Sequence, residues 1–315
     1  MKKTFRLFTS TLSQLGVLLL FLSPSLHAQS NPTTPWLTDF QVAKKAAAKE
    51  KKDIALLFTA SDWLDLAKTF DEKILSQKEF LDQASSRYIL VKLDFPKDKA
   101  RIKQQTATQN QLLMQAYRVR GLPTMVLTDD LGRPYAITGY HDGGLTAWLE
   151  EFNLLRQTRE KRDRLIAEAK QVEGVERAQL LAQALPDLPG NIAARFYRNI
   201  MNEAIKLDPA NKSGRIEYYK SLIADVQYAD QMQKLALEGN DKKMLALSKH
   251  YLKVGYLNAA SRQSVLFNIF GIYEKQNNTD LMGKTLQAII NTAPDSSQGK
   301  QAATLQEKLK VKASK

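Results

Sequence analysis

Residues 56–68, which read LLFTASDWLDLAK, decide the fold of this 315-residue chain. The apolar run that ends at Thr59 is typical of a buried strand, and the polar segment 61–63 (Ser-Asp-Trp) predicts a turn. Apolar residues at helical spacing then continue to about Leu75. The stretch therefore predicts a strand that passes through a turn into a helix.

A second motif lies downstream, where residues 119–124 read Val-Arg-Gly-Leu-Pro-Thr. Together with the strand, turn and helix, it resembles the thioredoxin family, in which Trp-Cys-x-x-Cys opens the helix and a Val-x-Gly-x-Pro-Thr loop packs against it. The resemblance is strongest to secreted bacterial thioredoxin-like proteins that read Ser-Asp-Trp-Cys-x-x-Cys. It implies that the Leu122–Pro123 bond is cis, an isomer that is rare except before proline. It also implies that Leu64 and Ala67, next to Trp63, occupy the two sulfur positions of a vestigial active site.

The chain contains no cysteine. Thiol–disulfide exchange requires a thiolate, and the side chain of Leu64 has no ionisable atom. Many thioredoxins also keep a buried acid six residues before the first cysteine, where Phe58 stands here. We therefore expect a redox-inactive protein that is a thiol–disulfide oxidoreductase by descent only, and not an enzyme.

Composition and the N-terminal residues indicate an exported globular protein. The chain is 43% hydrophobic and 25% charged, and its length suits two domains. Residues 1–28 have a basic start, an apolar run at 15–22 and a Leu-His-Ala end, which predicts a signal peptide cleaved after Ala28, although an uncleaved anchor is the alternative. No later stretch is apolar enough for a transmembrane segment. We therefore expect a periplasmic or secreted protein.

The net charge of +13 does not point to a nucleic-acid partner. The signal peptide carries three positive and no negative side chains, which leaves the mature chain near +10. Its basic residues are scattered among acids, so they favour solubility and weak nonspecific attraction. The lysines of residues 44–52 could form a polyanion patch or simply the solvated face of a helix.

The order of expected elements in residues 36–153 matches a thioredoxin-like domain. After a flexible mature N-terminus at 29–35, a helix begins at Trp36 and strands follow at 53–59, 88–95, 125–128 and 135–138. Residues 96–110 read as a surface excursion, and 111–118 as a short helix. A last helix starts at Leu145, with a buried face that includes Trp148. The resemblance implies a central mixed sheet flanked by helices.

Strand patterns stop after residue 153. Residues 154–165 read as a charged helical connector with interleaved signs, which favours a solvated helix. Residues 166–315 show helix-period segments, and those at 204–209 and 266–294 resemble tetratricopeptide repeats, whereas an unrelated bundle is the alternative. We therefore expect an α/β thioredoxin-like fold followed by an all-α helical-hairpin domain. The combination resembles a group of bacterial exported proteins with such an extension.

Other chemistry finds little support in the sequence. The two histidines after the signal peptide, His141 and His250, show no metal-binding spacing, so we expect no metal site and no cofactor. His141 and Asp142 could form an acid/base pair, but a plain glycine-rich loop is the simpler interpretation. Asp62 and Asp65 could act as paired carboxylates, or Ser61 or Asp62 could cap the helix.

The remaining hypothesis is recognition of another polypeptide. In thioredoxins the surface beside the active-site turn and the cis-proline loop receives an extended peptide, and such pairing uses backbone groups rather than sulfur. The expected binding residues are Asp62, Trp63, Leu64, Leu122, Pro123 and Thr124. The expected partner is an envelope protein or peptide, and the helical domain could serve as a second docking face or make a homo-oligomer.

Three alternatives stay open for these residues. Trp63 and Pro123 could merely maintain the fold. The helical repeats could carry all binding while the thioredoxin-like domain is structural. The chain could also be an enzyme of unknown, non-thiol chemistry.

Overall fold

The computed structural model describes residues 35–313. The expected signal peptide at 1–28 and nearly all of the mature N-terminus at 29–35 lie outside the described residues. Within them, no helix has both the length and the apolar character needed to cross a bilayer.

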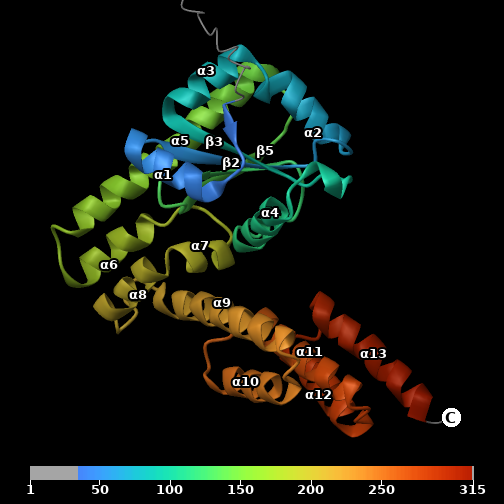
Figure 1. The fold of residues 1–315 in the computed structure, drawn as a ribbon. Coiled ribbons are helices and arrows are strands. Elements are labelled where there is room, and N and C mark those ends of the chain that lie inside the picture. The colour runs from blue at the N-terminus through green and yellow to red at the C-terminus, as the bar shows by residue number, and fades with distance from the viewer. Residues whose placement is uncertain (1–34, 314–315) are drawn as a thin grey trace, which may run out of the picture. The chain divides into compact units, whose positions relative to one another are not determined.

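A five-stranded mixed sheet forms the centre of the N-terminal part of the chain (Figure 1). Its strands are β1 (Trp36–Leu37), β2 (Asp53–Thr59), β3 (Tyr88–Asp94), β4 (Thr124–Thr128) and β5 (Pro134–Gly139), in the spatial order β1-β3-β2-β4-β5. The first three strands are parallel, whereas β4 runs antiparallel to both β2 and β5. The expected mixed sheet is confirmed.

Strand β2 lies at the middle of the sheet because its side chains are apolar on both faces. Every residue of this strand is buried, as its unbroken apolar run predicts. Successive side chains point to opposite faces, so Leu57 joins one core cluster while Leu56 and Phe58 join the other.

Helices cover both faces of the sheet. On the Leu57 side lie α2 (Asp65–Phe70), the π-helical turn η1 (Asp71–Leu75), α3 (Lys78–Arg87) and the first half of α5 (Gly144–Ala169). They contribute large aromatic rings to the core, among them Phe70, Phe80, Trp148 and Phe152. On the opposite side lie α1 (Phe40–Glu50) and α4 (Gln104–Ala116). Each large apolar side chain buried in this way contributes roughly 1.5–3 kcal/mol.

The structure corrects the expected start of the first helix. Trp36 and Leu37 form a short strand beside β3 rather than the first helical turn. The helix begins at Phe40 because the Asp39 carboxylate accepts hydrogen bonds from the backbone N–H groups of Gln41 and Val42.

The expected surface excursion at 96–110 is wrong in its second half. After a 3₁₀ turn, η2 (Lys99–Arg101), helix α4 starts at Gln104, seven residues before the expected start at 111. Asn110 is buried, and its side-chain amide donates to the backbone oxygen of Asp94 at 2.9 Å. A polar residue thus anchors this helix, which is why apolar periodicity did not reveal it.

The rest of the chain is helical. In the described residues, eight helices follow α5: α6 (Gly174–Gln183), α7 (Gly190–Phe196), α8 (Arg198–Leu207), α9 (Ile216–Leu237), α10 (Asp241–Lys253), α11 (Ala259–Lys275), α12 (Thr279–Thr292) and α13 (Ser297–Ala313). Residues that suggested a repeat, including Ile269, Tyr273, Leu286 and Ile289, share one core cluster between α11, α12 and α13. An all-helical C-terminal region is confirmed, and its classification as a repeat array stays a prediction.

Candidate binding site at the Trp63 turn

The turn at residues 60–64 lies at the carboxyl end of β2 and is fastened to the end of β3. The backbone N–H and the hydroxyl of Ser61 donate to the Asp94 carboxylate at 2.9 and 2.6 Å. The Asp62 carboxylate accepts from the backbone N–H of Lys97 at 3.1 Å, and the Arg101 guanidinium lies 3.4 Å from it. Side chains of the motif therefore hold the turn in place.

The expectation that Ser61 or Asp62 caps the following helix is wrong. The residue that precedes the first turn of α2 is Leu64, which makes no side-chain capping bond. Both polar side chains instead bind residues more than thirty positions away. Asp65 pairs with Lys68, so the two carboxylates of the motif have separate partners and do not form a catalytic pair.

The hydrogen bonds to the Asp62 carboxylate lower its pKa. Burial alone would raise it, but the backbone N–H groups of Lys97 and Asp98, helped by the positive charge of Arg101, hold the pKa below its ordinary value. Asp62 is therefore a carboxylate at neutral pH with a structural task.

Trp63 combines a fixed position with an open surface. Its indole Nε1–H donates to the backbone oxygen of Phe95 at 3.0 Å, yet 48% of the residue is exposed. Leu66, on the first turn of α2, is 47% exposed, and Leu64 is half-buried. Ala67 is buried under this surface. Leu66 was not among the residues expected from the sequence, because the two positions between the family's sulfurs carry no fixed residue type.

The second motif lies at the same end of the sheet. Thr124 begins β4 and pairs with Phe58 near the end of β2 and with Gly139 at the end of β5. The Leu122–Pro123 bond is cis, as expected. Pro123 is buried and Leu122 is half-buried.

In this loop, the backbone groups of Leu122 are available for hydrogen bonding. Thr124 donates its hydroxyl hydrogen to the backbone oxygen of Gly121 at 2.8 Å, which closes the loop. In the part of the chain that the structure describes, the backbone N–H and C=O of Leu122 have no hydrogen-bond partner. Leu122 is half-buried and lies just before β4, so its free backbone groups can pair with an incoming extended chain.

The carboxylate beside His141 belongs to Glu151 and not to Asp142, which was the alternative considered for an acid/base pair. Its Nε2 lies 2.6 Å from Glu151 on α5, whereas Asp142 offers only its backbone oxygen to Nδ1. Thr138 donates to the same Glu151 carboxylate at 2.8 Å. Glu151 was missed because it lies ten residues away, although it follows buried Trp148 by three residues on the helix that covers this loop.

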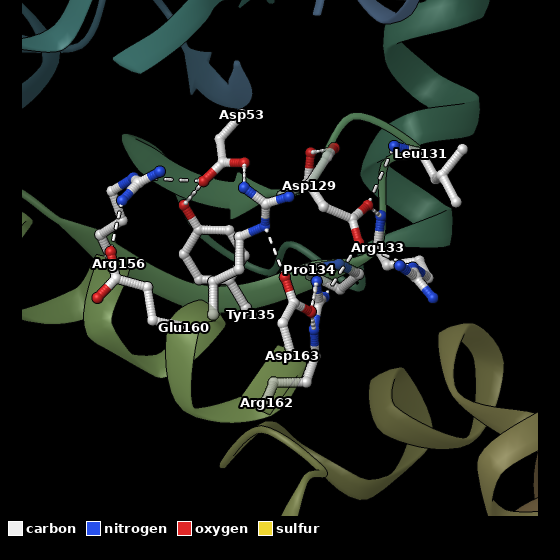
Figure 2. Close-up of polar contacts among 12 residues, drawn as sticks. Asp53, Asp129, Leu131, Arg133, Pro134, Tyr135, Arg156, Glu160, Arg162 and Asp163 are labelled. Atoms are coloured by element: carbon white, nitrogen blue, oxygen red, sulfur yellow. Dashed lines mark hydrogen bonds and ion pairs between the residues drawn. The ribbon is translucent and has the colours of Figure 1, made fainter. Parts of the chain in front are cut away.

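A buried charged cluster at the opposite end of the sheet was also missed (Figure 2). Asp53, the first residue of β2, is fully buried and accepts a hydrogen bond from the Tyr135 hydroxyl at 3.0 Å. Arg156 and Arg159 of α5 form ion pairs with its carboxylate. Burial raises the pKa of Asp53, and the charge of Arg159 opposes that rise. Burial raises the pKa of the nearby Tyr88 hydroxyl to about 12, so this side chain is neutral at neutral pH.

Asp129 forms the second half of this cluster. Its carboxylate lies 2.8 Å from Arg133 Nε and 3.0 Å from Arg162 Nη1. Arg162 is 1% exposed and also donates to the Tyr197 hydroxyl, which in turn donates to the backbone oxygen of Pro134 at 2.7 Å. Figure 2 shows Arg156 and Arg162 reaching the strands from the same helix.

The expectation of a solvated connector at 154–165 is therefore wrong for three of its four arginines, whereas Arg164 is exposed as expected. Arg156, Arg159 and Arg162 recur every three residues, so they lie along one side of the helix. That spacing was the available sequence signal, but the interleaved acids concealed it.

Comparisons with known proteins agree with this architecture. Residues 40–153 match the family model described as a thioredoxin-like domain, so this part of the chain is a thioredoxin-like domain. No cysteine is present in it, and Leu64 and Ala67 stand where the family resemblance places sulfur.

Two curated relatives come from Chlamydia pneumoniae. "Disulfide bond reductase DsbH" is 31% identical over 109 residues, covering 35% of this chain and 65% of the relative. "Thioredoxin-related protein DsbJ" is 26% identical over 120 residues, covering 37% of this chain and 34% of the relative. A solved structure titled "DsbH Oxidoreductase" has a TM-score of 0.36 at 28% identity, covering 38% of this chain and 82% of that one. The chain thus spans about two thirds and one third of the two curated relatives it matches.

Proposed function

We propose that this protein is a redox-inactive thioredoxin-like module that binds an extended segment of another envelope polypeptide. The binding surface would consist of the Trp63 turn, the exposed side chain of Leu66 and the Leu122–Thr124 loop. The observation that carries the proposal is the free backbone of Leu122, at the same end of the sheet as two large exposed apolar side chains.

Backbone pairing at Leu122 would supply orientation, and apolar contact would supply affinity. An extended chain that pairs with one residue directs alternate side chains to each side of the new strand. Trp63 and Leu66, each about half exposed, offer apolar area for such side chains. Fixing of the indole by Phe95 reduces the conformational entropy that binding would cost.

The relative named as a disulfide bond reductase differs from this chain in the chemistry that its name describes. Reduction of a disulfide requires a thiolate to attack sulfur, and these 315 residues contain no cysteine. What this domain can share with a disulfide reductase is the surface that receives a polypeptide.

We further propose that the protein acts outside the cytoplasm. Residues 1–28 carry the charge, apolar run and small-residue end of a secretory signal. A test is fractionation of cells that express the full chain, in which the mature mass and a non-cytoplasmic location should coincide.

Photo-crosslinking at single positions in intact cells tests the binding surface. A photoreactive residue at Leu66 should give a discrete adduct with another polypeptide, and the same residue at Leu131 should not, although Leu131 is even more exposed at the other end of the sheet. Mass spectrometry of the adduct identifies the partner.

A photoreactive residue at a third position tests the alternative that the helical region carries the binding. Leu237, at the end of α9, is strongly exposed in the helical region. An adduct from Leu237 in the absence of one from Leu66 would show that the helices carry the binding and would refute the proposed surface. An adduct of twice the chain mass from Leu237 would indicate a homo-oligomer formed through the helical region.

A further inference from the structure

A concave surface lies between α4 and the helices α7 and α9. It is a groove of about 630 Å³, within the range of small-ligand and peptide-side-chain sites. Three arginines line it: Arg118 and Arg120, which follow α4, and Arg195 on α7. Neither the Trp63 turn nor the Leu122 backbone belongs to this groove.

The positive charge of the groove is not neutralised within the described residues. Arg118 and Arg120 are exposed and have no carboxylate within ion-pair distance there. Arg195 pairs with Asp230 of α9, but its buried Nε–H has no acceptor in the same part of the chain. Three guanidinium groups therefore face one carboxylate, and at least two of them are free to bind anions.

The surface between the arginines is apolar and adaptable. Leu112 is 60% exposed, and Met114 and Val119 are half-buried beside it. Methionine side chains adapt to varied partners because they are unbranched and polarizable. The amides of Gln115 and Gln233, joined at 3.3 Å, form a polar rim.

Aromatic and backbone contacts fix the walls of the groove. Tyr117 stacks on Phe196 of α7 with ring centroids 4.8 Å apart, and its hydroxyl donates to the backbone oxygen of Gly132 at 2.7 Å. Arg118, two residues after the last residue of α4, lies in the left-handed backbone region with φ of 52°, a conformation that glycine adopts at lower cost. The chain thus presents an arginine at a position where backbone preference favours glycine.

We propose that this groove binds a polypeptide segment in which acidic side chains alternate with apolar ones. Guanidinium groups bind carboxylates through paired, charge-assisted hydrogen bonds, while the Leu112–Met114 surface takes the apolar side chains. A groove that places apolar side chains between arginines suits a polypeptide with both kinds of side chain better than a duplex, whose backbone offers phosphates. This site is independent of the one proposed at Trp63.

Fluorescence anisotropy with a synthetic peptide tests the proposal on the full mature chain. The probe is a short labelled peptide in which Glu alternates with Leu, and the comparison probe carries Gln at every Glu position. We expect the acidic probe alone to bind, with affinity that falls as salt rises because exposed charges are screened. The double variant Arg118→Gln/Arg120→Gln should weaken binding about tenfold or more, since hydrogen bonds to charged groups are strong.

A charge-matched variant shows whether binding depends on the groove or only on the net positive charge of the protein. Lys45→Gln/Lys49→Gln removes the same charge from exposed positions on α1 and should change binding less than about twofold, as expected for distant surface charges. Equal weakening by the two double variants, or no binding of the acidic probe, would overturn the proposal. It would also be overturned if vesicles containing phosphatidylglycerol, rather than the peptide, bound in a way that depends on Arg118 and Arg120.

Discussion

Asp62 illustrates how single side chains of the motif act on distant parts of the chain. Its carboxylate accepts backbone N–H groups from Lys97 and Asp98, which follow β3. These bonds join the Trp63 turn to the neighbouring strand end, so the exposed indole keeps one position. None of these bonds involves sulfur, so the turn is held in place with Leu64 at the family's first sulfur position.

Replacement of Asp62 by Asn should make stability less dependent on pH. Folding lowers the pKa of Asp62, so near that pKa the folded protein binds fewer protons than the unfolded chain. The carboxylate therefore stabilises the fold above its ordinary pKa of 3.8, and this contribution is lost as the pH falls through the lower folded-state value. Urea unfolding of the protein and of Asp62→Asn should show a gap in the free energy of unfolding above about pH 5 that narrows as the pH falls below 3.8.

Asp65→Asn serves as the control for that experiment. Asp65 is almost fully exposed and contacts Lys68 on its own helix turn, which is a weak surface ion pair. A pH-dependent gap of the same size for both variants would show that general loss of negative charge, and not the bonds from Lys97 and Asp98, is responsible.

Helix α5 is joined to distant parts of the chain by its charged side chains, as the Trp63 turn is by Asp62. Its first half buries aromatic side chains on the sheet, and its second half places Arg159 and Arg162 against the buried carboxylates of Asp53 and Asp129. A buried ion pair adds little net stability compared with an apolar pair, but removal of one partner leaves an uncompensated charge. The second half of α5 is therefore held to the sheet by buried ion pairs, and removal of one of its arginines should destabilise the fold.

Arg162→Met should destabilise the protein strongly. The substitution keeps an apolar stem of similar length but leaves the Asp129 carboxylate with Arg133 as its remaining cationic partner and removes the donor to Tyr197. We expect a loss of about 3–5 kcal/mol in the free energy of unfolding, measured by urea titration. Arg164→Met, two residues away on the exposed side, should change it by less than about 0.5 kcal/mol. A similar loss for both variants would contradict the buried-pair explanation.

Elements with apolar periodicity could be predicted from the sequence, and elements anchored by polar contacts could not. The run at Leu56–Phe58 and the Trp148–Phe152 face gave β2 and α5 because burial of apolar side chains repeats with the period of the structure. The start of α4 was missed because its anchor is the buried amide of Asn110.

The same limit applies to the candidate site. The cis proline and the position of Trp63 were implied by the family resemblance that two local motifs carry. The partners of Ser61 and Asp62 did not, because those partners lie more than thirty residues away and no local pattern encodes them. Arg118 and Arg195 converge on one groove although 77 positions separate them, so no motif could reveal it.

At the scale of the whole molecule, the boundary between the two expected domains falls inside a continuous helix. Helix α5 passes through residue 153, the expected end of the thioredoxin-like domain, without interruption. The three α5 arginines that contact Asp53 and Asp129, which are Arg156, Arg159 and Arg162, lie beyond that residue. Beyond α5, Phe196 and Tyr197 contact the sheet domain as well. These contacts favour a folding unit that is longer than the family match.

A pair of fragments tests where that unit ends. A fragment of residues 35–170 should be more stable toward urea than one of residues 35–153 by several kcal/mol, because the shorter one leaves two buried carboxylates without Arg159 and Arg162. The double variant Arg159→Met/Arg162→Met in the longer fragment should remove most of that advantage, which would assign it to the ion pairs rather than to added helix length. Equal stability of the two unmodified fragments would instead place the boundary at residue 153 and reduce the arginines of α5 to surface contacts.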